Sequence, residues 1–295
     1  MLGLGSRRAL LLALALGLAV AAGASAQPMA PAPNPQRFNA TEVQMRDVAA
    51  VVRIVPEQRS DVALSIVNPG PLSAPVVRVA GRRVVIDGRL GRDIRGCRSS
   101  NGQMQVDLRG RGRLSGDRLP QIELHVPQDA VIAAGGAVQM RVAHARSLRL
   151  DVGGCGDADA EGVTGAANVA AAGGADIRLY DAGSASARIA GSGDVTIGVV
   201  RSGFTASVAG SGDVIVARAD GPTNIALQGS GDVTIRDGRA TTLSVAIAGS
   251  GDFRHGGSAE RLDAAIVGSG DVHVREVNGP VARRVFGSGD VTIGR

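Results

Sequence analysis

The sequence predicts an all-β protein whose main part is a parallel β-solenoid with coils of about 19 residues. Three observations support this prediction: a tetrapeptide recurs at nearly constant spacing, apolar residues alternate behind each copy, and glycines occupy the corners. Gly-Ser-Gly-Asp occurs six times, and neighbouring copies are 19, 19, 20, 19 and 19 residues apart. A fixed period in this range is typical of proteins built from stacked repeats.

Each repeat contains two short β-strands. Apolar residues follow each Asp at one and three positions, as at Val195 and Ile197, and an alternating triplet follows later, as at Phe204, Ala206 and Val208. Alternation with a period of two predicts strands that bury one face. Because all repeats share this pattern, stacking them ~4.8 Å apart aligns like residues and builds the core that one coil lacks. A β-propeller is the alternative, but it would require pairs of unlike repeats.

The aspartate of each repeat is the sharpest candidate site. With two degenerate copies upstream, the series is Asp157, Asp176, Asp194, Asp213, Asp232, Asp252, Asp271 and Asp290. Stacked carboxylates ~5 Å apart would repel each other by ~1 kcal/mol in water, so something must offset that repulsion. We predict that they accept backbone hydrogen bonds as turn residues. Calcium is the alternative, but the calcium-binding β-helix repeat has a nonapeptide period, so we predict no metal or cofactor.

The N-terminal region predicts an exported protein. Residues 1–26 contain Arg7 and Arg8, a short apolar run and an Ala24-Ser25-Ala26 cleavage site, as in a cleaved signal peptide; a retained anchor helix is the alternative. Residues 27–37 are rich in proline and form a linker. We expect one solenoid domain over 38–295, with an irregular β part at 38–134 and regular coils at 135–295. Its location would be the periplasm, the outer envelope or the medium, and it would not span a membrane.

Two features of the early region suggest further sites. The stretch from Arg89 to Arg118 contains eight arginines and would dock an anionic envelope polymer, or else form a solvated loop tip. Cys97 and Cys155 allow one disulfide in an oxidising compartment, with two unpaired thiols as the alternative. Loss of Arg7 and Arg8 with the signal peptide lowers the formal net charge from +5 to +3, which is too small to favour a nucleic-acid partner.

Tandem Gly-Ser-Gly-Asp-Val-x-Ile coils after a β-rich segment, which includes Val51–Pro56 and Val62–Ile66, resemble a known family. This is the bacterial putative auto-transporter adhesin "head GIN" family, a domain of unknown function, and the resemblance runs from about Phe38 to Arg295. The resemblance implies a right-handed β-helix in the cell envelope. It supplies no catalytic residues to carry over.

We therefore predict a non-catalytic envelope scaffold or adhesive surface, whose partner is an envelope polysaccharide or another protein. The alternative is a carbohydrate-active β-helix enzyme, a polysaccharide lyase or hydrolase. Such an enzyme needs carboxylates in different environments within one cleft, whereas these are equivalent and periodic. Sugar-binding grooves also use aromatic platforms, and this chain has one Tyr, four Phe and no Trp. The histidines, at 125, 144, 255 and 273, lack metal-ligand spacing, and we expect them to be structural or solvated.

The last coil predicts an interaction. It stops at Asp290–Arg295, one strand past its corner, without a capping helix. Only Arg295 and its carboxylate would protect the unpaired edge, so we predict self-association through this C-terminal rung or addition of a partner strand. The alternative is an edge too short to pair.

Overall fold

The computed structural model describes residues 35–100 and 103–294 of the chain. The predicted signal peptide and residues 27–34 of the predicted linker lie outside the described residues. The described part contains β-strands, turns and one short 3₁₀ helix, η1 (Gly116–Arg118), so the prediction of an all-β chain is confirmed. No helix within these ranges is both long and apolar enough to cross a lipid bilayer.

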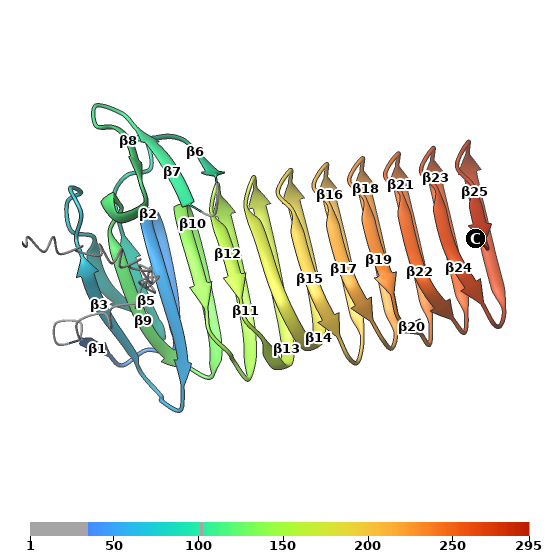
Figure 1. Ribbon diagram of the computed structural model, residues 1–295, viewed down its shortest axis with the longest axis horizontal. Coiled ribbons are helices and arrows are strands. Elements are labelled where there is room, and N and C mark those ends of the chain that lie inside the picture. The colour runs from blue at the N-terminus through green and yellow to red at the C-terminus, as the bar shows by residue number, and fades with distance from the viewer. Residues whose placement is uncertain (1–34, 101–102, 295) are drawn as a thin grey trace, which may run out of the picture. The chain divides into compact units, whose positions relative to one another are not determined.

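Twenty-three strands form one continuous hydrogen-bonded sheet that folds into two long parallel faces, which we call the first and second sheets, and most coils contribute one strand to each (Figure 1). Strands β2 (Glu42–Glu57), β10 (Asp129–Val142) and β14 (Asp176–Gly191) are long enough to belong to both sheets. The first sheet also contains β5 (Arg83–Asp87), β11 (Ser147–Gly154), β13 (Val163–Gly173), β16 (Phe204–Gly210), β18 (Thr223–Gly229), β21 (Leu243–Gly249), β23 (Leu262–Gly268) and β25 (Val281–Gly287). The second also contains β9 (Gln121–Pro127), β12 (Asp157–Ala160), β15 (Val195–Val200), β17 (Val214–Ala219), β19 (Val233–Asp237), β20 (Arg239–Ala240), β22 (Phe253–Ala259), β24 (Val272–Val277) and β26 (Val291–Ile293).

The strand register explains why the sequence repeat becomes a solenoid. Val195 of one coil lies beside Val214 of the next, and Val214 lies beside Val233, each step being one sequence period. These valines are fully buried, whereas the intervening Thr196 is exposed. Buried side chains from both sheets form one apolar cluster that runs from Ala40 to Val291. The predicted β-solenoid with coils of about 19 residues is confirmed.

Glycine is required where the first sheet turns toward the second. The first glycine of each Gly-Ser-Gly-Asp corner has a positive φ, from +122° at Gly229 to +146° at Gly249. A Cβ on Gly210 would lie 2.1 Å from the carbonyl oxygen of Gly191 in the preceding coil. Both the conformation and the close stacking of corners therefore exclude larger residues.

One coil is a residue longer than its neighbours. The Asp232–Asp252 spacing is 20 residues, and the strand of this coil is interrupted between β19 and β20, at Gly238. The pairing of Val233 with Phe253 and of Leu243 with Leu262 continues on either side. The additional residue is thus absorbed at the second corner and not at the glycine corner.

The irregular early region forms one parallel rung and an antiparallel cap. Strands β5 and β9 pair in parallel with the two halves of β2 and form the outermost rung. Strand β4 (Val76–Ala80) then pairs antiparallel with β5, β3 (Val62–Asn68) with β9, and β1 (Gln36–Phe38) with β3. The first two residues of β1 belong to the segment expected to be linker, and β10 crosses the boundary expected at residue 134.

A small, separate three-stranded sheet projects from this region. Strands β6 (Ile94–Ser100), β7 (Gln103–Leu108) and β8 (Gly112–Ser115) pair antiparallel, and we call residues 89–100 and 103–118 the flap. A second apolar cluster, which includes the flap's buried Met104 and Val106, packs with Ala49 and Ala137 of the solenoid. The flap was not predicted as a separate sheet.

The last coil has a polar group over its open end. Arg283 lies beside Ala264 in an inward column, and its guanidinium donates a 3.4 Å hydrogen bond to the carbonyl of Val291. Val281 and Val285 in the same strand are 39% and 37% exposed. The expectation that only Arg295 and its carboxylate protect this edge is wrong, because it overlooked Arg283; Arg295 itself lies outside the described residues.

Candidate binding surfaces

The repeated aspartates form a hydrogen-bonded ladder along the solenoid. Each carboxylate from Asp176 to Asp271 accepts a bond of 2.8–3.0 Å from the backbone N–H of the corresponding Asp in the next coil. These bonds join neighbouring coils, whereas the sequence had suggested a turn within one coil. Each N–H offsets part of the repulsion between stacked carboxylates. Because these aspartates all make the same bond, the arrangement favours a structural role over a catalytic one.

Asp157 departs from the ladder. The next aspartate, Asp176, donates its N–H to the carbonyl of Gly156 instead. Burial raises the pKa of Asp157, the Ser99 hydroxyl of the flap opposes that shift by hydrogen bonding, and repulsion from Asp176 adds to it. Asp157 therefore lies at the junction between flap and solenoid, where the regular contact is lost.

The two cysteines lie at the same junction. Cys97 is on β6 of the flap, and Cys155 takes the serine position in an early corner. The structure pairs their sulfur atoms as a disulfide, with the Cα atoms 5.9 Å apart. This separation is within the usual range for a disulfide. Such a bond would fix the flap to the side of the solenoid.

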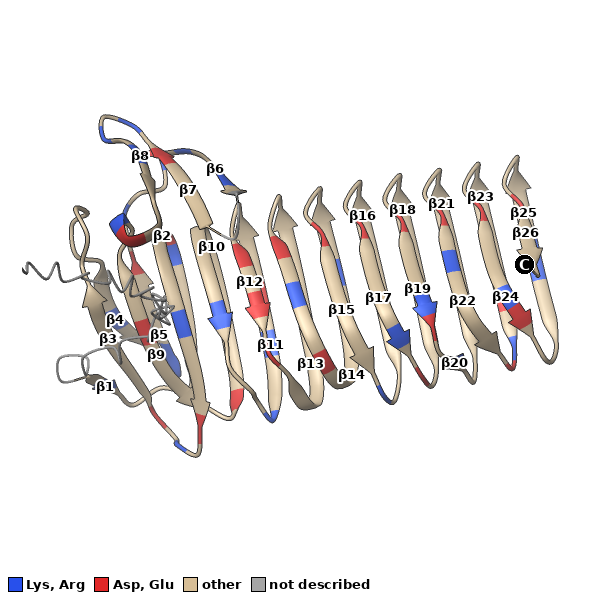
Figure 2. Ribbon diagram, viewed as in Figure 1, with Lys and Arg blue, Asp and Glu red and all other residues tan. Residues whose placement is uncertain are grey.

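The flap concentrates unpaired positive charge. All eight of its arginines are exposed, and none has a side-chain hydrogen bond or ion pair within the described residues: Arg89, Arg92, Arg95, Arg98, Arg109, Arg111, Arg113 and Arg118. The flap contains only three acidic residues, Asp93, Asp107 and Asp117. Figure 2 shows the positive segments on β6 and around the β7–β8 turn. Arginines of the solenoid are often paired, as in Arg146–Asp129 and Arg239–Glu260.

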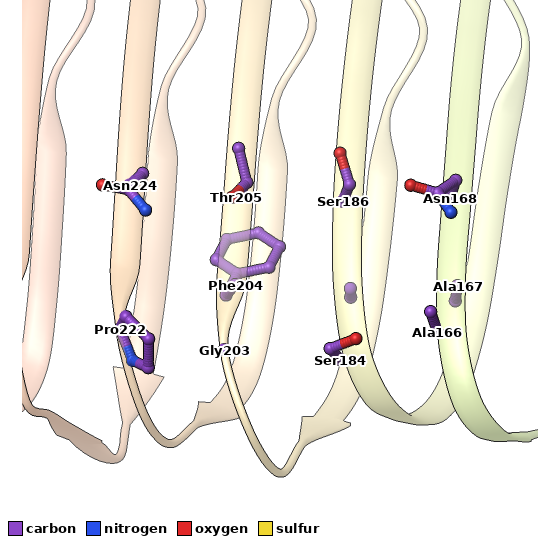
Figure 3. Close-up of a pocket in the computed structure, with 11 residues that line it drawn as sticks. Ala166, Ala167, Asn168, Ser184, Ser186, Gly203, Phe204, Thr205, Pro222 and Asn224 are labelled. Atoms are coloured by element: carbon purple, nitrogen blue, oxygen red, sulfur yellow. The ribbon is translucent and has the colours of Figure 1, made fainter.

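A groove of about 300 Å³ lies on the outer face of the first sheet. Figure 3 shows a row of neutral polar side chains, Asn168, Ser186, Thr205 and Asn224, on four successive strands. None of the four makes a side-chain hydrogen bond within the described part of the chain. The row was not predicted, because the predicted repeat rests on the inward positions of each coil and the row occupies outward ones. Aligning the outward positions at the same period would have found it.

The four histidines lie in unrelated places. His125 contacts Glu57 and Glu123 at 2.7 and 2.9 Å, and His144 contacts Glu161 at 3.1 Å. His255 is fully buried in an inward column, and burial lowers its pKa. No group of three or more His, Cys, Asp or Glu side chains among the described residues is arranged to hold a metal ion.

Comparison with known proteins identifies the family. The model of the family described as "Putative auto-transporter adhesin, head GIN domain" matches residues 104–219 and 217–294. No curated protein matches the chain. A putative lipid binding protein from Parabacteroides distasonis is similar in structure, at 16% identity and a TM-score of 0.49, over 90% of this chain and 98% of that one.

Putative adhesins give similar values. One from Parabacteroides distasonis has 13% identity and a TM-score of 0.44, over 88% of this chain and 96% of that one. One from Parabacteroides merdae has 12% identity and a TM-score of 0.46, over 89% and 96%. With TM-scores below 0.5, these likenesses carry no further argument. The family model, however, matches more than half of the chain, and the protein therefore belongs to the family of putative auto-transporter adhesins with the head GIN domain.

Proposed function

We propose that this chain is a non-catalytic binding module, exported to the cell envelope, whose flap adheres to an anionic envelope polysaccharide. The observation that carries the proposal is the unpaired charge of the flap: eight exposed arginines against three acidic residues. Guanidinium groups bind carboxylates and phosphates through paired hydrogen bonds, and unpaired ones are free to do so. The family's description as an adhesin and the predicted signal peptide support the location.

The polar surface of the flap favours a polysaccharide over a protein partner. Its apolar side chains, such as Met104, Val106 and Leu108, point toward the solenoid and are buried. Its outward side chains, such as Arg98 and Arg113, are polar. Protein interfaces usually have an apolar or aromatic centre, and the outward side chains described for the flap form none. A charged polymer requires only an accessible set of opposite charges.

The test is binding of the periplasmically expressed protein to polygalacturonate, with dextran as the neutral control. We expect polygalacturonate to bind, with affinity falling as salt rises, because salt screens exposed charges. Replacing Arg109, Arg111 and Arg113 by Gln should weaken binding about tenfold. A matched variant that replaces the exposed Arg188, Arg261 and Arg275 of the solenoid should change it less than about twofold.

Three outcomes would contradict the proposal. Equal binding by both triple variants would remove the flap from the contact. Binding to envelope proteins but not to polygalacturonate would identify a protein partner instead. Release of cleaved polygalacturonate fragments would show an enzyme, the alternative class for a β-helix of this kind.

The last coil supports a second contact of the proposed module. Strands β25 and β26 each pair on one side only, with β23 and β24. Their backbone groups on the other side can pair with the end strand of a second copy, and the partly exposed Val281 and Val285 can pack against it. Arg283 opposes this contact by placing a charge in an inward column. The proposed association is therefore weak.

A further inference from the structure

The outer face of the second sheet contains a notch between Tyr180 and Arg236. The two residues lie in one outward column, on β14 and β19, and the two strands between them contribute Gly198 and Ala217. Since Gly198 has no side chain and Ala217 has one methyl group, the column is hollow there. The resulting space is about 300 Å³, near the lower end of small-molecule sites, which are ~300–1,000 Å³.

The walls of the notch combine an aromatic ring with positive charge. Tyr180, the only tyrosine of the chain, is 63% exposed. Arg236 lines the opposite end and has no side-chain partner among the described residues. Arg178 lines the notch beside Tyr180, and its one ion pair, with Asp159, spans 3.6 Å.

The adjacent outward column adds an apolar and a polar contact. Thr196 and Ile215 lie beside Gly198 and Ala217 and also line the notch. Thr196 presents a hydroxyl that can donate and accept hydrogen bonds, and Ile215 presents a branched alkyl group. The notch thus provides an exposed ring, an apolar side wall, a hydroxyl and two guanidinium groups.

We infer that this notch binds an acidic sugar, a pyranose ring that carries a carboxylate, within a short stretch of anionic glycan. This inference rests on the proposed function and names the unit of the polymer that the solenoid recognises. The apolar face of the sugar ring packs on Tyr180, whose ring has both an apolar body and a polar tip. The carboxylate pairs with Arg236 in bidentate geometry, and Thr196 contacts ring hydroxyls.

The spacing of the notch fits this ligand. Tyr180 and Arg236 are three strand spacings apart, ~14 Å between backbones, and both side chains are long. One or two sugar units lie over Gly198 and Ala217 within that distance. A purely apolar ligand would offer no anionic group to Arg178 or Arg236, and a neutral glycan would offer none to Arg236.

The experiment is a titration of the full chain with trigalacturonate, followed by NMR or calorimetry, with maltotriose as the neutral control. We expect trigalacturonate to bind at least tenfold more tightly than maltotriose. Tyr180→Ala and Arg236→Gln should each weaken binding about tenfold, whereas Tyr180→Phe, which keeps the ring, should change it less than threefold. Arg188→Gln, which removes an exposed arginine from the opposite sheet, is the matched control and should have no effect.

The outcomes separate this inference from the proposed function. If the flap binds polygalacturonate but trigalacturonate does not bind, or binds equally to wild type, Tyr180→Ala and Arg236→Gln, the notch assignment is wrong and the proposed function stands. If trigalacturonate binds in the notch while the flap variant retains full polymer binding, the flap assignment is wrong instead. Equal affinity for maltotriose would overturn the acidic-sugar specificity. Circular dichroism of each variant checks that the solenoid is folded.

Discussion

The backbone N–H of Asp290 donates a 2.8 Å hydrogen bond to the carboxylate of Asp271 in the preceding coil. The carboxylate of Asp290 has no further coil to serve among the described residues, and it accepts the N–H of its own neighbour Val291, at 2.8 Å. In the preceding coil the equivalent N–H, of Val272, donates to the carbonyl of Asp290. Inside the stack the aspartate carboxylate therefore accepts an N–H from the next coil, whereas in Asp290, at the end of the stack, it accepts an N–H from its own strand.

This difference predicts unequal effects along the ladder. Asp232→Ala would leave the N–H of Asp252 without its acceptor and should lower the free energy of unfolding by about 1–2 kcal/mol. Asp232→Asn keeps an acceptor oxygen and removes one charge from the ladder, so its effect should stay within about 0.5 kcal/mol. Asp290→Ala should also cost less than Asp232→Ala, because its carboxylate serves only its own coil.

Hydrogen exchange at the amide of residue 252, together with urea unfolding, checks the ladder prediction. Exchange measures the local contact even if the coils do not unfold together. Equal losses for Asp232→Ala and Asp290→Ala would show that the bond between coils contributes nothing measurable.

The disulfide between Cys97 and Cys155 stays a prediction with two direct measurements. Mass spectrometry of non-reduced protein from the periplasm should find no alkylatable thiol. The bond would close a loop over a sequence separation of 58 residues, for which chain-entropy arguments give about 4 kcal/mol of stabilisation. The double variant Cys97→Ser, Cys155→Ser should lower the free energy of unfolding by up to about 4 kcal/mol and make the flap more mobile. Two free thiols in periplasmic material would rule the bond out.

Buried His255 predicts a stability that falls at mildly acidic pH. Burial lowers the pKa of His255 below 6.5, the nearby charge of Arg275 adds to this shift, and Asp237 and the carbonyl of Ser258 oppose it. The unfolded chain therefore binds a proton more readily than the folded chain. The free energy of unfolding should decrease as pH falls below about 6.5, by at most about 1.4 kcal/mol per pH unit.

The His255→Ile variant tests this assignment. Nε2 of His255 donates to the carbonyl of Ser258 at 3.2 Å, whereas buried Nδ1 has no hydrogen-bond partner. An isoleucine, like Ile235 in the same column, removes that buried unpaired nitrogen and should stabilise by about 1 kcal/mol. Urea unfolding at several pH values should show a flatter profile for His255→Ile than for wild type. If His273→Gln flattens the profile equally, His255 is not its source.

Arg283 predicts how strongly the last coil self-associates. Its guanidinium lies in the column that Ala264 fills one coil earlier. Arg283→Val would make the open end apolar and should raise the apparent mass in light scattering at high protein concentration. A polar capping segment fused after Arg295 should abolish association of both wild type and variant. If uncapped wild type and uncapped Arg283→Val are both monomeric at every concentration, this edge does not mediate self-association.

The repeat was predictable because it encodes the same contacts many times. Val195, Val214 and Val233 occupy one column in sequence and in space, so periodicity alone determines the register. The flap has no such redundancy: Met104 and Val106 alternate like any strand, and nothing in the sequence indicates that they pack on Ala49 and Ala137. The antiparallel direction of the cap strands was not predicted either, since strand direction does not follow from alternation.

The candidate sites were less predictable than the fold. The Asp series was found because it repeats, but its partner is in the next coil, and this depends on how the corners stack. The notch depends on a break in a pattern, with Gly198 and Ala217 where neighbouring coils have Tyr180 and Arg236. Two small residues such as Gly198 and Ala217 do not stand out in a single sequence. Only the stacking of the coils in the structure shows that they lie next to each other.

The position of the 20-residue coil bears on how the length of the solenoid can change. The additional residue lies between Asp237 and Leu243, at the second corner, so this corner accommodates one insertion, whereas the stacked glycine corners leave no room even for a Cβ. Copying a whole coil, by contrast, adds ~4.8 Å of length and repeats contacts that already exist. The flap is held near the N-terminal rungs, and the last coil lies at the other end of the stack (Figure 1). Duplication or loss of coils would therefore change the distance between these two ends in fixed increments, so that the solenoid serves as an adjustable spacer.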